Sequence, residues 1–138
     1  MPAKDIYHDT ARSALLKDGW TITHDPFVLR WGTTDVFIDL GAEQLFAAER
    51  HGQKIAVEVK SFVGRSDVDD LEKVLGQYIL YHDILAKTEP ERVLYLAVHE
   101  EVLLGIFDEA IGRLLLENQR VKLLVFDRRE EVILRWIP

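Results

Sequence analysis

Apolar residues recur at helical spacing in three parts of the chain, and each part predicts a helix. These parts are residues 4–18, 67–86 and 100–118. In the first, a stripe repeats at three- and four-residue intervals, as expected of a helix that packs on a core. Ser66 can cap the second helix, and the aspartates after it favour the positive end of the helix dipole. The third is expected to break near Gly105 or Asp108.

Runs rich in alternating or β-branched residues predict strands between and after these helices. They cover residues 20–24, 27–31, 35–49, 54–62, 92–98, 121–126 and 131–137. We expect Asp25-Pro26 to end the first strand, Gly41 to bend the third, and residues 49–53 to form a hairpin loop. The order of elements predicts the α/β class, with a central mixed β-sheet flanked by helices.

Length and composition fit one globular domain over residues 1–138. Hydrophobic residues make up 48% and charged residues 30% of the chain, an ordinary mixture for a globular protein. The absence of cysteine excludes disulfides, thiolate zinc sites and a cysteine nucleophile. No apolar run approaches the ~20 residues that a bilayer-spanning helix needs. We therefore expect a cytoplasmic protein that does not enter a membrane.

The net charge limits how the chain can bind DNA. At −7, with an isoelectric point near 5.2, it argues against a protein that holds DNA through bulk positive charge. It does not exclude a nuclease, because acidic metal ligands add negative charge to the metal-free protein. The charge therefore permits a local nucleic-acid site but predicts no broad basic surface.

The most informative segment joins Asp39 to Glu58-Val59-Lys60. Eighteen residues separate Asp39 from Glu58, which is enough for a strand, a turn and a return strand. A hairpin can therefore bring the two carboxylates together. Strand alternation places Val57 and Val59 on one face, and Glu58 and Lys60 on the other. The acid and the amine then project together, away from the apolar face.

Two carboxylates and a backbone carbonyl form an oxygen-rich pocket. Asp39, Glu58 and the carbonyl of Val59 are candidate ligands of Mg²⁺ or Mn²⁺, because hard cations prefer oxygen. Such a cation lowers the pKa of a bound water and stabilises charge on a phosphodiester. Lys60 is then a candidate to hold the attacking water or to stabilise the phosphate. The alternative is an ordinary ion pair on the strand surface.

The same residues resemble a known superfamily. A helix, a strand, Ile38-Asp39, a hairpin, Glu58-Val59-Lys60 and a further helix are similar to the PD-(D/E)xK nucleases, although Ile38 replaces the proline. The resemblance implies a restriction-endonuclease-like fold. Gln77 and Tyr81 resemble the Q-x-x-x-Y element of some members, where Gln77 would orient the site. Core packing is an equal alternative for Tyr81.

Residues on the first predicted helix are candidate accessory members of the site. In related nucleases an acidic residue on the first helix completes the metal site, and His8, or in second place Asp9, would occupy that position. The favoured alternative for His8 is a helix-surface histidine with a nearby hydrogen bond. Trp20, Trp31 and Trp136 are expected to be packing residues, too scattered to form a base-stacking platform.

Longer strings resemble the cyanobacterial excision-controlling-factor family XisH. They are Lys4–His8, Leu16–Pro26, Ile38–Glu43, Ile55–Phe62 and Val121–Asp127. The resemblance implies a role in programmed excision of a DNA element, together with an XisI-like partner and a site-specific recombinase. Two hypotheses follow. One is a metal-dependent endonuclease active in DNA rearrangement; the other is a catalytically silent regulator that keeps the scaffold and binds the partner.

The last strand also raises the question of self-association. Val132, Leu134 and Trp136 alternate along it, and an edge strand can pair with a second chain. A homo-oligomer is therefore a further candidate.

Overall fold

The computed structural model describes residues 4–35 and 45–138. Its helices are α1 (His8–Lys17), α3 (Asp67–Thr88), α4 (Glu100–Leu104), the 3-10 turn η1 (Ile106–Asp108) and α5 (Ala110–Glu117). Its strands are β1 (Thr21–Phe27), β2 (Arg30–Trp31), β3 (Thr34–Asp35), β4 (Leu45–Arg50), β5 (Gln53–Val59), β6 (Arg92–His99), β7 (Leu123–Asp127) and β8 (Val132–Ile137). None of these helices is both long and apolar enough to cross a bilayer.

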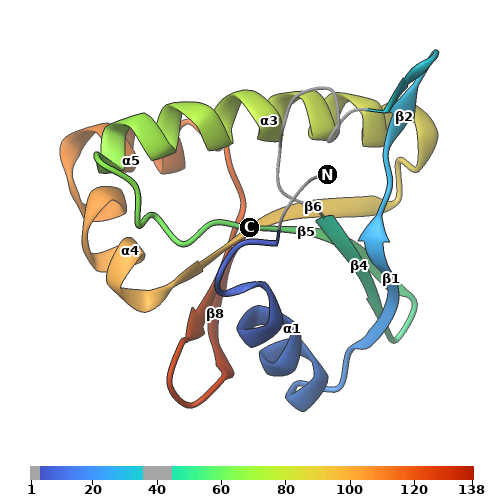
Figure 1. The fold of residues 1–138 in the computed structure, drawn as a ribbon, viewed down its shortest axis with the longest axis horizontal. Helices are drawn as coiled ribbons and strands as arrows, with labels where there is room; N and C mark the ends of the chain where they lie inside the picture. The colour runs from blue at the N-terminus through green and yellow to red at the C-terminus, as the bar shows by residue number, and fades with distance from the viewer. Residues whose placement is uncertain (1–3, 36–44) are drawn as a thin grey trace.

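Six of the strands form one mixed sheet in the order β1-β4-β5-β6-β7-β8 (Figure 1). The central pairs β5–β6 and β6–β7 are parallel, and the outer pairs are antiparallel. The strands β2 and β3 form a separate two-stranded hairpin. The predicted α/β class with a central mixed sheet is confirmed.

The loop between β4 and β5 is the tight hairpin expected at residues 49–53. His51 and Gly52 have φ angles of 50° and 81°. Two successive positive φ angles are typical of a type I′ turn, whose twist matches that of the flanking strands. The turn sets the register that pairs Ala47 with Ala56 and Phe46 with Val57.

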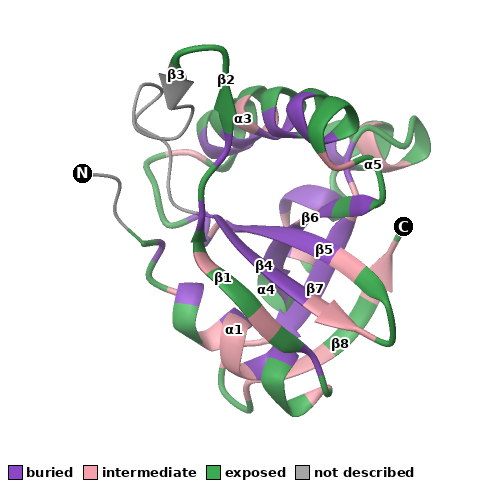
Figure 2. Cartoon of the chain, turned by 90° about the vertical axis from the view of Figure 1, so that its right-hand side faces the viewer, coloured by how far each residue is buried: buried purple, intermediate pink, exposed green. Residues whose placement is uncertain are grey.

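Helices cover both faces of the sheet. The long helix α3 lies along one face and the short helix α1 lies on the other (Figure 1). Figure 2 shows that most of the central strands β5, β6 and β7 is buried, with exposed positions near the start of β5 and β6. The α3 face carries one apolar cluster, and the α1 face carries a second. Since both faces are covered, residues of either parity along a central strand are buried.

The helix boundaries agree with the sequence pattern except at the N-terminus. Helix α1 begins at His8 rather than near residue 4, because the Asp5 side chain accepts a hydrogen bond from the Tyr7 amide in a preceding turn. The Ser66 side chain caps α3 through the Asp69 amide. The break predicted near Gly105 or Asp108 is confirmed: the chain leaves α4 at Gly105, and the 3-10 turn η1 follows up to Asp108.

The first strand differs from its prediction. Asp25-Pro26 was expected to end it, but β1 continues to Phe27. The reason is position: β1 is the outer strand of the described sheet, and its pairing with β4 shifts register twice between Ile22 and Phe27. An edge strand with irregular pairing tolerates a proline because no neighbour needs its missing N–H. Of the predicted strand 35–49, residues 36–44 lie outside the described part of the chain.

Candidate functional site

The predicted pair Glu58 and Lys60 lies at the carboxyl end of β5, on the face covered by α3. Ala56, two residues before Glu58, belongs to the apolar cluster of that face, and strand alternation carries Glu58 to the same side. Glu58 is only 3% exposed, whereas the Lys60 side chain is 21% exposed. The prediction that the two share a face, away from Val57 and Val59, is therefore confirmed. A surface ion pair is excluded for Glu58, because the carboxylate is buried.

Lys60 lies beside an acid that the sequence pattern did not single out. Its Nζ is 3.9 Å from Oδ1 of Asp70, in the first turn of α3. The other oxygen of Asp70 accepts a hydrogen bond from the Gly64 amide at 2.9 Å. A Cβ at Gly64 would lie 2.6 Å from Oδ1 of Asp70, so a side chain there would displace this carboxylate. Asp70 thus holds the loop after β5 against α3. In the sequence, Asp70 stood out only as one of the aspartates near the start of the predicted helix.

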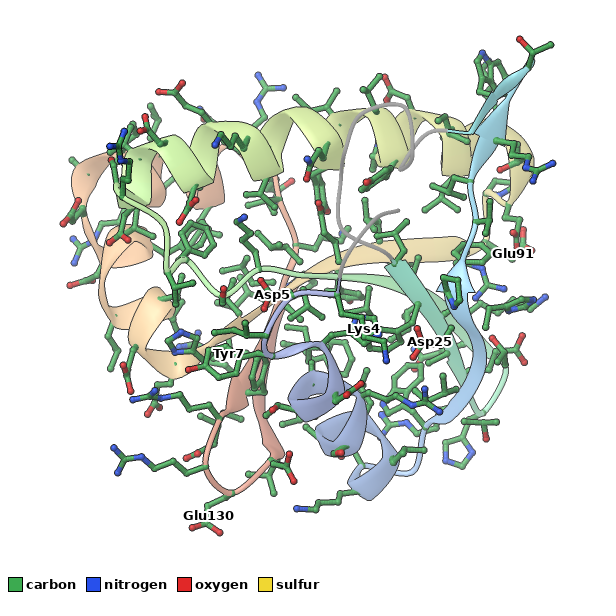
Figure 3. The ribbon with its side chains drawn as sticks, in the orientation of Figure 1. Lys4, Asp5, Tyr7, Asp25, Glu91 and Glu130 are labelled. Atoms are coloured by element: carbon green, nitrogen blue, oxygen red, sulfur yellow. The ribbon has the colours of Figure 1, made fainter. Side chains whose placement is uncertain are left out.

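A second buried carboxylate, Asp5, meets the same loop from the N-terminal segment (Figure 3). Its Oδ2 accepts a hydrogen bond from the Ser61 amide at 2.9 Å, and its Oδ1 accepts one from the Tyr7 amide at 2.9 Å. Asp5 is 6% exposed. The backbone directly after Lys60 is therefore fixed by two acids, Asp5 and Asp70, from opposite sides of the sheet. Sequence reasoning missed Asp5, because the pattern placed it inside the predicted helix 4–18, whereas it lies in the turn before α1.

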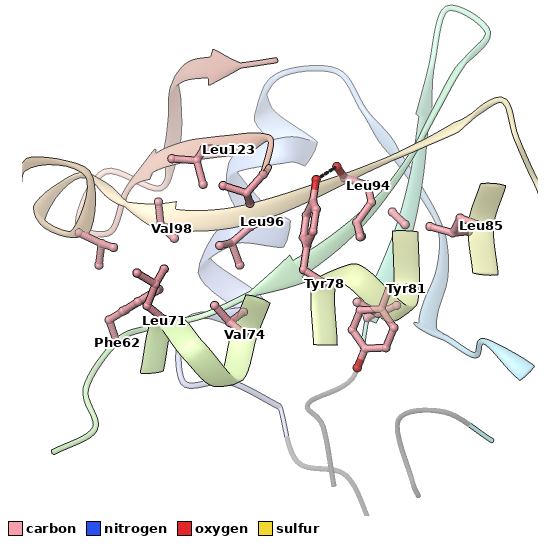
Figure 4. Close-up of a cluster of buried hydrophobic side chains, with 14 of the residues drawn as sticks. Phe62, Leu71, Val74, Tyr78, Tyr81, Leu85, Leu94, Leu96, Val98 and Leu123 are labelled. Atoms are coloured by element: carbon pink, nitrogen blue, oxygen red, sulfur yellow. Dashed lines mark hydrogen bonds between the residues drawn. The ribbon is translucent and has the colours of Figure 1, made fainter. Parts of the chain in front are cut away.

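The interior next to Glu58 favours neutral groups. The buried Tyr78 hydroxyl donates a hydrogen bond to the Leu94 carbonyl at 3.0 Å and accepts one from the Lys122 amide at 3.1 Å (Figure 4). Burial raises the pKa of Tyr78 to about 12; the Lys122 amide opposes this rise, and the charge of Glu58 adds to it. Glu58 therefore acts electrostatically on the α3 core, as expected of a charge with little water around it.

The remaining predicted ligands are only partly within reach. Asp39 lies outside the described residues. Val59 is the last residue of β5, and its side chain packs in the cluster of the α1 face. Within residues 4–35 and 45–138, no group of three or more acidic or histidine side chains is arranged to hold a metal ion. The metal site with Asp39 stays a prediction.

The two residues of the Q-x-x-x-Y element differ in burial. Gln77 is half-buried on α3. Tyr81, one turn later, is completely buried within the apolar cluster of the α3 face (Figure 4). This position agrees with the core-packing alternative for Tyr81. A role for Gln77 in orienting a site stays a prediction.

His8 lies in different surroundings from those expected. It is 1% exposed rather than on the helix surface, because its ring packs edge-on against Phe46 on the α1 face. Its Nε2 is 3.0 Å from Oδ1 of Asp25, and Arg12 donates to Oδ2 of the same carboxylate at 2.6 Å. The expected nearby hydrogen bond is present. His8 thus faces the side of the sheet opposite to Glu58, within a charged cluster formed by His8, Arg12 and Asp25.

Comparisons with known proteins agree with the resemblance seen in the sequence. The profile of the family described as "XisH protein" matches residues 1–134. A solved XisH family protein from Nostoc punctiforme superposes with a TM-score of 0.88 at 40% identity, over 97% of this chain and 100% of the other. No curated protein matches the chain significantly.

A second solved structure extends this result. It is an fdxN element excision controlling factor protein from Anabaena variabilis, with a TM-score of 0.87 at 42% identity. The match covers 96% of this chain and 98% of the other. Since the family profile and both structures span nearly the whole chain, the protein belongs to the XisH family.

Proposed function

We propose that this chain is a metal-dependent nuclease-fold factor of the PD-(D/E)xK kind that acts in excision of a DNA element. The observation that carries the proposal is the burial of the Glu58 carboxylate on the same strand face as the half-buried Lys60. Charged side chains are rarely buried unless they are paired or bind a metal ion. A site that holds a divalent cation would give the Glu58 carboxylate such a use.

The donor set fits Mg²⁺ or Mn²⁺. Asp39, Glu58 and the Val59 carbonyl would supply oxygen ligands, which hard divalent cations prefer, and burial of Glu58 suits a ligand shielded from bulk water. When bound, the cation would lower the pKa of a water and stabilise negative charge on the phosphodiester. Lys60 would orient that water or the scissile phosphate, and Gln77 would orient the site. Asp70, 3.9 Å from the Lys60 ammonium, would restrain the lysine.

The biological setting is taken from the relatives. The Anabaena variabilis protein is described as an fdxN element excision controlling factor, and this chain covers 98% of it at 42% identity. We extend that role to this chain, with DNA as the substrate and an XisI-like protein as its partner. A site-specific recombinase would perform the excision itself.

The test is a cleavage assay with defined cations. The protein, alone and with an XisI-like partner, is incubated with supercoiled, linear, single-stranded and branched DNA in Mg²⁺, Mn²⁺ or EDTA. We expect cation-dependent cleavage that is lost in Glu58→Gln and in Lys60→Ala. Lys73→Ala is the matched control, because Lys73 is exposed on α3 and should leave cleavage unchanged. Equal cleavage by all four proteins would overturn the assignment of Glu58 and Lys60.

A catalytically silent regulator is the second candidate, and two observations favour it. The net charge is −7, and the Lys60 ammonium lies beside a protein carboxylate on α3. In this case the scaffold would bind the XisI-like partner without hydrolysing DNA. No cleavage under any condition, combined with intact partner binding in size-exclusion chromatography, would favour the regulator.

A further inference from the structure

A pocket of about 520 Å³ opens on the α1 face of the sheet, beyond the end of helix α1. Its walls include Trp20, Arg50, Lys54, Glu91, Tyr95 and Trp136. It lies at the start of β5 and β6, whereas Lys60 follows the end of β5. Lys60 lies six positions after Lys54 along extended chain, or about 20 Å at ~3.3 Å per residue. Figure 3 shows Glu91 at the opposite end of the sheet from Asp5 and Tyr7. The pocket is therefore distinct from the candidate site at Glu58.

Three aromatic rings meet in this pocket from distant parts of the chain. The Trp136 ring, on β8, lies 4.9 Å from the Tyr95 ring on β6 and 5.5 Å from the Trp20 ring after α1. Tyr95 and Trp136 are half-buried, and Trp20 is buried behind them. The expectation that Trp20 and Trp136 are packing residues is confirmed, but the two are not scattered. Trp20 follows α1, which packs against β8 across the α1 face, and this brings the two rings together.

Fixed charges border the rings. The Arg50 guanidinium lies 4.8 Å from the centre of the Trp20 ring. It is held there by two hydrogen bonds to Asp18, at 2.7 Å to the carbonyl and 2.8 Å to the carboxylate. Lys54 and Glu91 form a loose pair at 3.8 Å on the rim. The named lining residues thus combine aromatic surface with two cationic groups and one anionic group.

We propose that this pocket binds a nucleobase. Half-buried aromatic rings stack on planar heterocycles of any sequence, and a nearby arginine adds a cation–π contribution. The volume falls within the range of small-molecule sites. Charged groups at the rim match the polar edge of a base and the phosphate attached to it, which an aliphatic ligand lacks. The base can come from a free nucleotide or from an unpaired strand. Binding does not depend on hydrolysis at Glu58, because the pocket lies on the other face of the sheet.

The test is a fluorescence titration with three kinds of probe. These are the four deoxynucleoside monophosphates taken singly, a single-stranded 12-mer, and an abasic 12-mer of the same length. We expect binding of base-containing probes, weakened roughly 5- to 150-fold in Trp136→Leu and in Tyr95→Leu, from the strength of base stacking on one aromatic side chain. Trp31→Leu is the matched control, since Trp31 is 53% exposed on the β2–β3 hairpin and does not line the pocket.

The outcomes distinguish a free nucleotide from an unpaired strand. They also distinguish this pocket from the proposed nuclease function. Binding of monophosphates assigns a free nucleotide, and binding of the 12-mer alone assigns an unpaired strand; either supports the pocket. Equal binding of the abasic 12-mer, equal loss in Trp31→Leu and Trp136→Leu, or no binding at millimolar probe overturns it. If the pocket variants fail to fold, a shift of the Trp136 indole N–H resonance in the wild-type protein decides. Lys60→Ala should bind unchanged, so loss of cleavage alone leaves this inference standing.

Discussion

The two faces of the sheet are covered by helices of very different length, and this difference determines where polar chemistry is found. Helix α3 has 22 residues and α1 has 10, which correspond to about 33 Å and 15 Å at 1.5 Å per residue. An eight-residue strand such as β6 spans about 26 Å. Helix α3 therefore spans the full strand length, and together with α4, η1 and α5 it forms one apolar cluster on its face. Helix α1 covers about half of its face.

The α1 face carries polar and aromatic groups both at α1 itself and beyond its end. The cluster of His8, Arg12 and Asp25 lies beside α1 and β1, and the pocket of Trp20, Tyr95 and Trp136 lies beyond the end of α1. On the α3 face, by contrast, Glu58 and the Tyr78 hydroxyl are polar groups inside an otherwise apolar core. Perturbing single polar groups on each face tests this contrast.

The largest effect is expected on the α1 face, from Asp25→Ala. The substitution removes the carboxylate that pairs with the buried His8 and with Arg12, and breaking a buried pair from one side costs about 3–5 kcal/mol. Urea denaturation at pH 7 measures the change. Asp9→Ala is the matched control: Asp9 is 77% exposed and 3.4 Å from Lys4, so its loss should cost less than about 0.5 kcal/mol. Similar losses in both variants would contradict the distinction.

The second-largest change in the free energy of unfolding is expected on the α3 face, at alkaline pH. Burial raises the pKa of Tyr78 from 10.0 to about 12. The folded state therefore binds its phenolic proton more tightly than the unfolded state does. The contribution of this proton to the free energy of unfolding is fully present below pH 10. It is lost as the pH rises through 12, by about 2–3 kcal/mol. The free energy of unfolding of the wild type minus that of Tyr78→Phe, measured from pH 8 to 12, isolates this contribution. A constant difference would refute it.

At neutral pH the same Tyr78→Phe change should cost about 1–3 kcal/mol. It leaves the buried Leu94 carbonyl and Lys122 amide without the hydroxyl that joins them. Denaturant unfolding at pH 7 gives the value. Tyr95→Phe is a suitable comparison, because Tyr95 is half-buried on the α1 face, and it should cost less.

The smallest change in stability is expected from Lys60→Met. The lysine side chain is 21% exposed and 3.9 Å from Asp70, a separation at which partly exposed ion pairs contribute about 1 kcal/mol or less. Thermal unfolding should therefore be nearly unchanged, while any cation-dependent cleavage is lost. A destabilisation above about 2 kcal/mol would indicate that Lys60 has a structural role instead.

Local patterns in the sequence were sufficient for most of the elements and for the pair at the end of β5. Helical spacing identified α3, and alternation placed Glu58 opposite Val57. The pattern could not say that α3 would bury Glu58, because alternation separates two faces without showing what covers each. Asp70 was visible only as a helix-start acid, and its approach to Lys60 depends on how the loop after β5 returns to the helix.

The sequence by itself determined the α/β class, the β4–β5 hairpin, the shared face of Glu58 and Lys60, and the resemblance to the XisH family. These depend on residues close together in the chain or on long matching strings. Only the tertiary structure decided that His8 meets Asp25 and that Trp20 meets Trp136. Such contacts join segments far apart in the chain, and the packing of α1 and of the residue after it across the sheet brings them together.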